Sequence, residues 1–220
     1  TSTSFGDPVV FNSDDSRYID VVSIGNGKVV VVYRDDGNSY KGTAIVGTIS
    51  GTSISFGAES EFNSNAGNWN SVTYDSTNDK VVIAYTDTGN SSRGYAIVGT
   101  VSGTSISFGS EVQFESGTSV EHSATFDSTN GKVVIAYLDN SNSDKGTAVV
   151  GTVSGNSISF GTPVIFNNAT TENVTTTFDS ANGKVVIAYT DNGNSWYGTA
   201  IVGTVSGTSI SFGSEVVYES

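Results

Sequence analysis

The sequence has no cysteine, no methionine, one histidine and two prolines among its 220 residues. Without cysteine, disulfide frameworks, thiolate zinc sites and cysteine nucleophiles are excluded. The single histidine, His122, leaves most hydrolytic triads and histidine-rich metal sites without their usual groups. Any site in this chain is therefore expected to use carboxylates, amides, hydroxyls and aromatic rings.

Basic residues are also scarce: 9 lysines and arginines stand against 22 acidic residues, giving a formal net charge of −13. A polyanion of this kind repels nucleic-acid backbones and anionic lipid headgroups, so neither is an expected partner. The sequence contains no stretch approaching the roughly 20 apolar residues that cross a bilayer, and no membrane insertion is expected.

A repeat of 52 residues dominates what is present. One string, GTVSGTSISFG with small variations, begins at Gly47, Gly99, Gly151 and Gly203. A second block reads KVVVVY at Lys28 and KVVIAY at Lys80, Lys132 and Lys184. Such self-similarity indicates a repeat architecture.

Each period contains four runs that favour strands, separated by turn residues. In the second copy these runs are 71–74, 81–85, 95–101 and 105–114. Because the loops between them are short, neighbouring strands should be antiparallel. The sequence therefore predicts an all-β fold, a β-propeller built of four 52-residue, four-stranded antiparallel blades. The alternative is a segment of a longer β-repeat array.

The predicted domain organisation is a single repeat domain over 1–220, with blades at approximately 12–63, 64–115, 116–167 and 168–220. The last strand of the period occurs five times although four blades are present, and its terminal copies are Phe5–Phe11 and Phe212–Tyr218. We expect one of them to close the ring, with residues 1–11 as an extra outer strand.

Two resemblances accompany this layout. The run Tyr189-Thr-Asp-Asn-Gly-Asn-Ser-Trp196 is similar to the Asp-box, S-x-D-x-G-x-T-W, of sialidase-like propellers, although its first residue is Tyr and it lies one hairpin earlier. The GTVSGTSISFG and KVVIAY units resemble the repeat regions of tail-fibre and other virion-surface proteins of marine bacteriophages. The first resemblance implies a propeller fold, and the second implies attachment to a host surface.

Differences between the copies point to a recognition surface on one rim of the blades. Equivalent positions before the inner strand hold Tyr, Trp, Glu and Asn, and the neighbouring hairpins also vary. Trp, Tyr and Arg are favoured at binding sites, whereas drift of exposed loops does not concentrate them. The candidate ligand-binding residues are Tyr18, Tyr40, Trp69, Asn70, Arg93, Glu121, His122, Asn173, Trp196 and Tyr197.

The hairpin aspartates Asp35, Asp87, Asp139 and Asp191 do not vary between copies. A carboxylate in such a turn accepts backbone N–H groups, which is the role we predict. Clustered oxygen donors also make Asp35, Asp36, Asp139 and Asp144 weak calcium candidates, although no complete calcium-binding loop is present. No other metal and no cofactor is expected.

The predicted function is a non-enzymatic recognition or adhesion module that binds a cell-surface glycan or another polar surface ligand, as part of a virion fibre or extracellular surface protein. Aromatic rings suit the apolar faces of sugars, and carboxylates and amides suit their hydroxyls. Other fibre or virion subunits are the expected protein partners. The alternative is a structural spacer with no ligand of its own.

An enzyme is not expected. Sialidases need an arginine triad, and Arg17, Arg34 and Arg93 lie at unrelated positions. Glu121 and Glu172 also lack the second carboxylate at a fixed spacing that glycoside hydrolysis requires.

Overall fold

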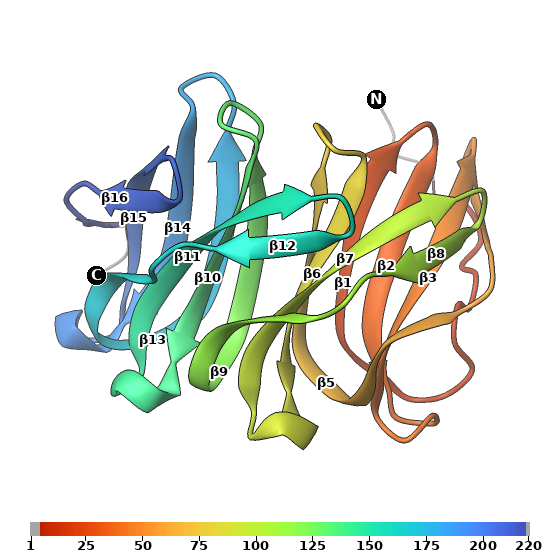
Figure 1. Ribbon diagram of the computed structural model, residues 1–220, viewed down its shortest axis with the longest axis horizontal. Coiled ribbons are helices and arrows are strands. Elements are labelled where there is room, and N and C mark those ends of the chain that lie inside the picture. The colour runs from red at the N-terminus through yellow and green to blue at the C-terminus, as the bar shows by residue number, and fades with distance from the viewer. Residues whose placement is uncertain (1–4, 219–220) are drawn as a thin grey trace.

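The computed structural model describes residues 5–218 and consists of β-strands with three single-turn 3-10 helices (Figure 1). The all-β class predicted from the sequence is confirmed. None of the helices in the described residues is long and apolar enough to span a membrane.

Strand pairing divides the described chain into four units. Unit 1 spans 16–66, unit 2 spans 67–118, unit 3 spans 119–170 and unit 4 spans 171–218. The strands of the first two units are β1 (Ser16–Gly25), β2 (Lys28–Asp35), β3 (Lys41–Ser50), β4 (Ser53–Phe56), β5 (Ser60–Asp75), β6 (Lys80–Asp87), β7 (Arg93–Ser102) and β8 (Ser105–Phe108). The remaining strands are β9 (Val112–Asp127), β10 (Lys132–Asp139), β11 (Lys145–Ser154), β12 (Ser157–Phe160), β13 (Val164–Asp179), β14 (Lys184–Asp191), β15 (Tyr197–Ser206), β16 (Ser209–Phe212) and β17 (Val216–Val217). The 3-10 helices are η1 (Thr88–Asn90), η2 (Asn140–Asn142) and η3 (Asn192–Asn194), each in the hairpin after β6, β10 or β14.

Three strands belong to two units at once. In β5, residues 60–66 pair with β3 of unit 1, and residues 67–75 pair with β6 of unit 2. Strands β9 and β13 repeat this arrangement, and all three are 16 residues long. The outer edge of one unit therefore continues into the inner strand of the next.

The strand predicted over 105–114 is divided in the structure into β8 and the start of β9. The break falls at Gly109, where a Cβ would lie only 1.9 Å from the carbonyl oxygen of Asn156 in the next unit. The chain turns at this close contact, so β8 and β9 pair with different halves of β7.

The core lies between successive units. The β-branched runs of β2, β6, β10 and β14 carry four completely buried tyrosines, Tyr33, Tyr85, Tyr137 and Tyr189. At the first joint, Val30, Val32, Ala44 and Val46 of unit 1 pack with Val81, Ile83, Tyr85 and Ile97 of unit 2. Equivalent clusters join units 2 and 3, and units 3 and 4. Strands covered on both faces explain why these runs are apolar without alternation.

The prediction that a terminal strand closes the blades into a ring is wrong for the described residues. Among residues 5–218, β1 pairs with β2 alone, and β17 pairs with β15 of its own unit. Figure 1 shows unit 1 and unit 4 at opposite ends of the array. The expected strand at Phe5–Phe11 is also absent; Phe11 instead packs on Tyr33 and Phe56 of unit 1, with ring centroids 5.1 and 5.9 Å away. Of the predicted boundaries, residues 1–4 and 219–220 lie outside the described chain.

Candidate ligand pocket on the inner strands

The inner strand of every unit contains one residue other than glycine in the left-handed backbone region, at the same position in each copy. These residues are Tyr18, Trp69, Glu121 and Asn173, with φ of 51°, 52°, 54° and 55°. A register shift interrupts the pairing with the neighbouring strand at each of them. Left-handed backbone is uncommon for residues other than glycine, and bulges of this kind redirect a side chain. Four of the sequence-predicted candidates therefore occupy the four copies of one specialised position.

A pocket of about 250 Å³ opens beside these left-handed residues, where units 2, 3 and 4 meet. It is lined by Trp69, Glu121, His122, Asn173 and Val174. Four of these five residues were predicted from the sequence as ligand candidates, and the structure brings them together. The lining combines one aromatic ring, one carboxylate, one imidazole and one amide.

Glu121 is the acidic group of the pocket. Its Oε2 accepts the backbone N–H of Asn173 in the next unit. Burial raises the pKa of the Glu121 carboxyl, and the backbone N–H groups of Asn173 and Val174 partly oppose this by stabilising the anion. The carboxylate therefore ties unit 3 to unit 4 while it borders the pocket.

His122 forms the buried floor of the pocket. Its Nδ1 lies 3.2 Å from the carbonyl oxygen of Trp69, and its Nε2 lies 3.0 Å from Oγ of Ser119. Since a carbonyl only accepts, Nδ1 carries the proton and Nε2 accepts from the Ser119 hydroxyl. Burial lowers the pKa of His122 to about 4, so the ring is neutral at neutral pH. It positions the Trp69 backbone and is not a free base.

Tyr18 extends the aromatic side of the site. Its ring centroid lies 5.1 Å from that of Trp69, with the planes tilted by 45°. The Arg34 guanidinium lies 5.0 Å from the Tyr18 centroid and 5.3 Å from the Tyr40 centroid, within cation–π range of both. Arg34 also donates to Oδ1 of Asn68 over 2.7 Å. These contacts give the aromatic group a fixed support.

The sequence did not single out Arg34 as part of this site. It stands on β2 where the equivalent strands carry Thr86, Leu138 and Thr190. Alignment of the repeats could have revealed this departure. Val174, the apolar wall of the pocket, is equally visible as the counterpart of His122 in unit 4.

Asn70 is buried beside the site, in the position equivalent to His122. Neither its Nδ2 nor its Oδ1 has a hydrogen-bond partner in the described chain, and the same holds for Nδ2 of buried Asn63. Gly67 explains the deficit: a Cβ built there lies 3.4 Å from Oδ1 of Asn70, and the equivalent residues Ser119 and Thr171 carry hydroxyls. In unit 4, Thr171 Oγ1 accepts from Nδ2 of Asn167 over 3.1 Å.

The remaining candidates are not part of the pocket lining. Tyr40 reaches the aromatic group only through Arg34. Arg93 begins β7, Trp196 lies in the hairpin before β15, and Tyr197 begins β15 in unit 4. Trp196 is 49 % exposed, so it remains available for an independent contact.

The hairpin aspartates act within their turns, and three of the four accept a backbone N–H as predicted. Asp35, Asp87 and Asp191 each accept the backbone N–H of the residue two positions later, and Asp139 accepts from the Ser141 hydroxyl over 2.6 Å. Of the other calcium candidates, Asp36 pairs with Arg34 at 2.6 Å, and Asp144 accepts from Asn140 at 2.8 Å. Within residues 5–218, no group of three or more metal-binding side chains is assembled.

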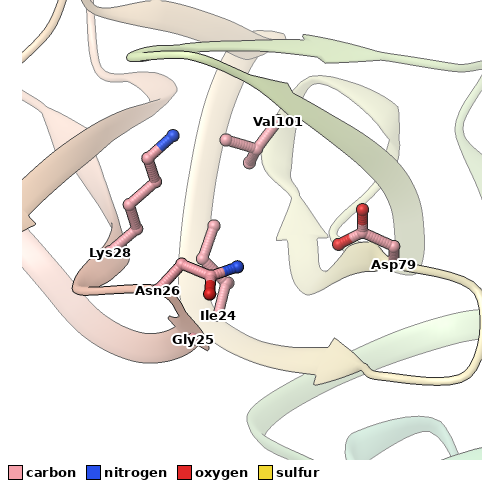
Figure 2. A pocket seen from close by; sticks show the side chains of 6 residues that line it. All are labelled: Ile24, Gly25, Asn26, Lys28, Asp79 and Val101. Atoms are coloured by element: carbon pink, nitrogen blue, oxygen red, sulfur yellow. The ribbon is translucent and has the colours of Figure 1, made fainter.

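A second pocket, of about 120 Å³, lies at the turns between units 1 and 2 and has a different character (Figure 2). Figure 2 shows Lys28 and Asp79 on opposite sides of it. Both are engaged: Lys28 Nζ donates to the Gly103 carbonyl over 2.6 Å, and Asp79 accepts from the Tyr74 hydroxyl over 2.7 Å, which raises the pKa of Tyr74 to about 12. These contacts hold turns in place, so the inner-strand pocket is the stronger candidate site.

Comparison with known proteins shows a likeness in fold and none in sequence. No protein-family model matches the chain, and no curated protein matches its sequence. Among solved structures, it is similar to an exo-β-1,3-galactanase from Phanerochaete chrysosporium that was crystallised with β-1,3-galactotriose. The TM-score is 0.57 at 10 % sequence identity, over 94 % of this chain and 50 % of the galactanase. The chain thus spans half the length of that protein, and the likeness concerns the fold.

Proposed function

We propose that this chain is a glycan-binding module whose ligand sits in the pocket formed by Trp69, Glu121, His122, Asn173 and Val174. The observation that carries the proposal is the placement of a partly exposed tryptophan beside a carboxylate and an amide on successive inner strands. A sugar ring presents an apolar C–H face and a rim of hydroxyls, and this lining offers a complement to each. The galactanase likeness supports a carbohydrate as the ligand class.

Binding without hydrolysis is part of the proposal. Glycosidases of the common types use a pair of carboxyl groups on opposite sides of the bond that they cleave. Glu121 is the one carboxylate in the pocket lining, and its Oε2 is occupied by a backbone N–H. We place the module in a propeller-type array of blades on a virion fibre or extracellular surface protein, in keeping with the repeat resemblance.

The direct test is titration with β-1,3-galactotriose, followed by a panel of neutral oligosaccharides, using tryptophan fluorescence and calorimetry. The variant Trp196→Phe leaves Trp69 as the single tryptophan, so a change in its emission reports on the pocket. We expect Trp69→Ala to weaken binding by at least about 30-fold, as loss of a central aromatic contact does.

The matched control is Trp196→Ala, which removes the other exposed tryptophan and should leave the affinity unchanged. Equal loss of binding in both variants would place the ligand elsewhere or show a general effect on folding. Absence of binding to every glycan, with the wild-type protein folded, would overturn the proposal.

A second candidate function is a structural spacer in a larger fibre, without a ligand. The two uncovered ends of the array favour it, because a repeat that is not closed can be extended. Electron microscopy of the assembled fibre distinguishes the candidates: a spacer is followed by further repeats and a separate tip, whereas a binding module exposes its pocket at the contact surface.

A further inference from the structure

The two ends of the array leave partly exposed the faces that are buried at the internal joints. At unit 1 the centre of the face, Val31, Tyr33 and Ile45, is buried with Phe11 and Phe56, and the exposed residues lie around it. We call the face that a unit turns toward the next unit its leaving face, and the face turned toward the preceding unit its entering face. The leaving face of unit 4 consists of Val186, Ala188, Ala200 and Val202. Its equivalents in units 1 to 3 are buried against a neighbour. Val202 is 46 % exposed, whereas Val46, Val98 and Val150 are at most 1 % exposed.

Unit 1 has exposed apolar side chains on its entering face. Ile49 is 45 % exposed, while its equivalents Val153 and Val205 are 7 % and 5 % exposed at internal joints. Val29 is also partly exposed, although Val81 in the same position of unit 2 is buried. Both ends therefore present apolar side chains whose counterparts are more buried at internal joints, fully at Val153 and Val205 and partly at Val101.

A glycine contact marks each joint in addition to the apolar cluster. A Cβ built on Gly57 or Gly109 would lie 2.0 or 1.9 Å from a carbonyl oxygen of the next unit, so the two backbones touch. Gly6 makes the same contact with Thr52 of unit 1. Gly213, the equivalent residue of unit 4, has no atom closer than 3.8 Å to such a Cβ.

The segment 6–11 therefore occupies on unit 1 the place that the outer segment of a preceding unit occupies at internal joints. Phe11 packs on Tyr33 and Phe56 as Phe62 packs on Tyr85 and Phe108. At an internal joint this outer segment also pairs with the third strand of its own unit, as 60–66 pairs with β3. In unit 4 that strand is β15. Among the residues that the structure describes, β17 pairs with it at Thr199–Val217 and Ala200–Val216, and the N–H of Tyr218 donates to the Gly198 carbonyl over 2.9 Å.

We propose that the leaving face of unit 4 binds the entering face of unit 1 in a second copy of this chain. The segment 6–11 of the second copy then pairs with β15 of the first in place of β17. A second copy is the expected partner because three internal joints of the molecule already show these two faces packed on one another. The contact is heterologous, since different surfaces of the two copies meet, and it leaves one free face at each end. It is independent of the glycan pocket.

The test uses one lysine on each face. Val202→Lys blocks the leaving face, and Ile49→Lys blocks the entering face; both positions are exposed in the single chain, so its melting temperature should change little. Sedimentation velocity of the wild type should show a mass that increases with protein concentration. Each variant alone should remain monomeric where the wild type associates, with association weakened about 100-fold or more by a charge buried in an apolar joint.

Mixing the two variants gives the decisive measurement. Val202→Lys retains a wild-type entering face, and Ile49→Lys retains a wild-type leaving face. An equimolar mixture should therefore form a two-chain species and nothing larger. The matched control is Ile165→Lys, which changes a residue of β13 that is 42 % exposed and whose equivalent in unit 1 is Glu61; it should associate as the wild type does.

Three results would overturn the proposal. A wild-type protein that stays monomeric at all concentrations would show that the end faces have another occupant. Single variants that associate like the wild type would place the contact elsewhere. A mixture that fails to associate would show that the contact is not between the two different faces.

Discussion

Units 2 and 3 place different side chains on the same backbone, and the difference decides how each inner strand is held. In unit 3, His122 hydrogen-bonds to the Ser119 hydroxyl and to the Trp69 carbonyl, and no buried side-chain polar atom of this pair lacks a partner within the described residues. In unit 2 the equivalent residues are Gly67 and Asn70, and both polar atoms of the Asn70 amide are buried without a partner among residues 5–218. A repeated fold thus supports both a satisfied polar cluster and an unsatisfied one, because the apolar joints carry the stability. Three experiments sharpen this comparison.

The largest expected effect is a pH dependence that only unit 3 introduces. The folded-state pKa of His122 is about 4, below its ordinary value of 6.5, so the unfolded chain binds the proton first. The stabilisation from neutral His122 is complete above about pH 6.5 and is lost as pH falls toward 4. We expect the free energy of unfolding to fall by about 3 kcal/mol from this group over that interval. Urea unfolding at a series of pH values measures it.

The control for this pH dependence comes from unit 2. His122→Asn installs the residue that unit 2 carries at the same position and removes the titrating ring. The difference in unfolding free energy between wild type and variant should shrink on going from pH 6.5 to 4. A constant difference would contradict the buried neutral imidazole.

The next effect concerns the buried tyrosines. Tyr85 of unit 2 donates its hydroxyl proton to Glu111 over 2.6 Å, but unit 3 has Pro163 at the position equivalent to Glu111. Tyr137 uses Glu115 instead, at 2.9 Å, and Glu115 also accepts the backbone N–H of Gly117. Glu115→Asn should cost about 1–3 kcal/mol of unfolding free energy, because it leaves a buried hydroxyl without an acceptor.

A double-mutant cycle checks this substitution against the pattern of the other units. Pro163→Glu alone should change stability little, since Tyr137 already has an acceptor. Combined with Glu115→Asn, it should restore most of the lost stability by recreating the arrangement of unit 2. If the two changes prove additive, Glu115 does not serve as the substitute acceptor.

The smallest effect should come from making unit 2 more like unit 3. Gly67→Ser places a hydroxyl near Asn70, as Ser119 does near His122, although its Cβ lies 3.1 Å from Cα of Gly42 and requires a small backbone adjustment. We expect a gain of about 1 kcal/mol, typical of one hydrogen bond to a buried group that lacked one. Thermal unfolding at neutral pH measures it, with Gly94→Ser as the contrasting change, because a Cβ there meets Phe114 at 2.6 Å and should destabilise. Gly67→Ala measures the cost of the close contact with Gly42 by itself; a Gly67→Ser variant no more stable than Gly67→Ala would contradict the new hydrogen bond.

The sequence predicted those features that the repeat itself displays. The 52-residue period, the strand content and the equivalence of Tyr18, Trp69, Glu121 and Asn173 all follow from aligning the copies. The pocket could be predicted in part, because four of its five lining residues were candidates chosen for their variation at aligned positions. Arg34 was missed, since its role depends on two tyrosine rings that meet only in three dimensions.

The open array could not be predicted from the repeat. Whether a ring closes depends on the rotation between units, and that rotation is set by how side chains such as Tyr85 and Ile97 interlock at each joint. The number of repeats in the sequence, taken alone, suggested that the blades close into a ring. In the same way, strand patterns located 105–114 but gave no sign that Gly109 meets a backbone carbonyl of the next unit.

The strands shared between units determine how such a protein can gain or lose a repeat. Because β5, β9 and β13 each change partners in mid-strand, at 66/67, 118/119 and 170/171, no loop separates one repeat from the next. A genetic duplication of 52 residues, cut anywhere in the period, delivers one complete joint together with its strand crossing. Array length can therefore change by recombination without the invention of a new interface, while each added copy is free to acquire its own inner-strand side chain.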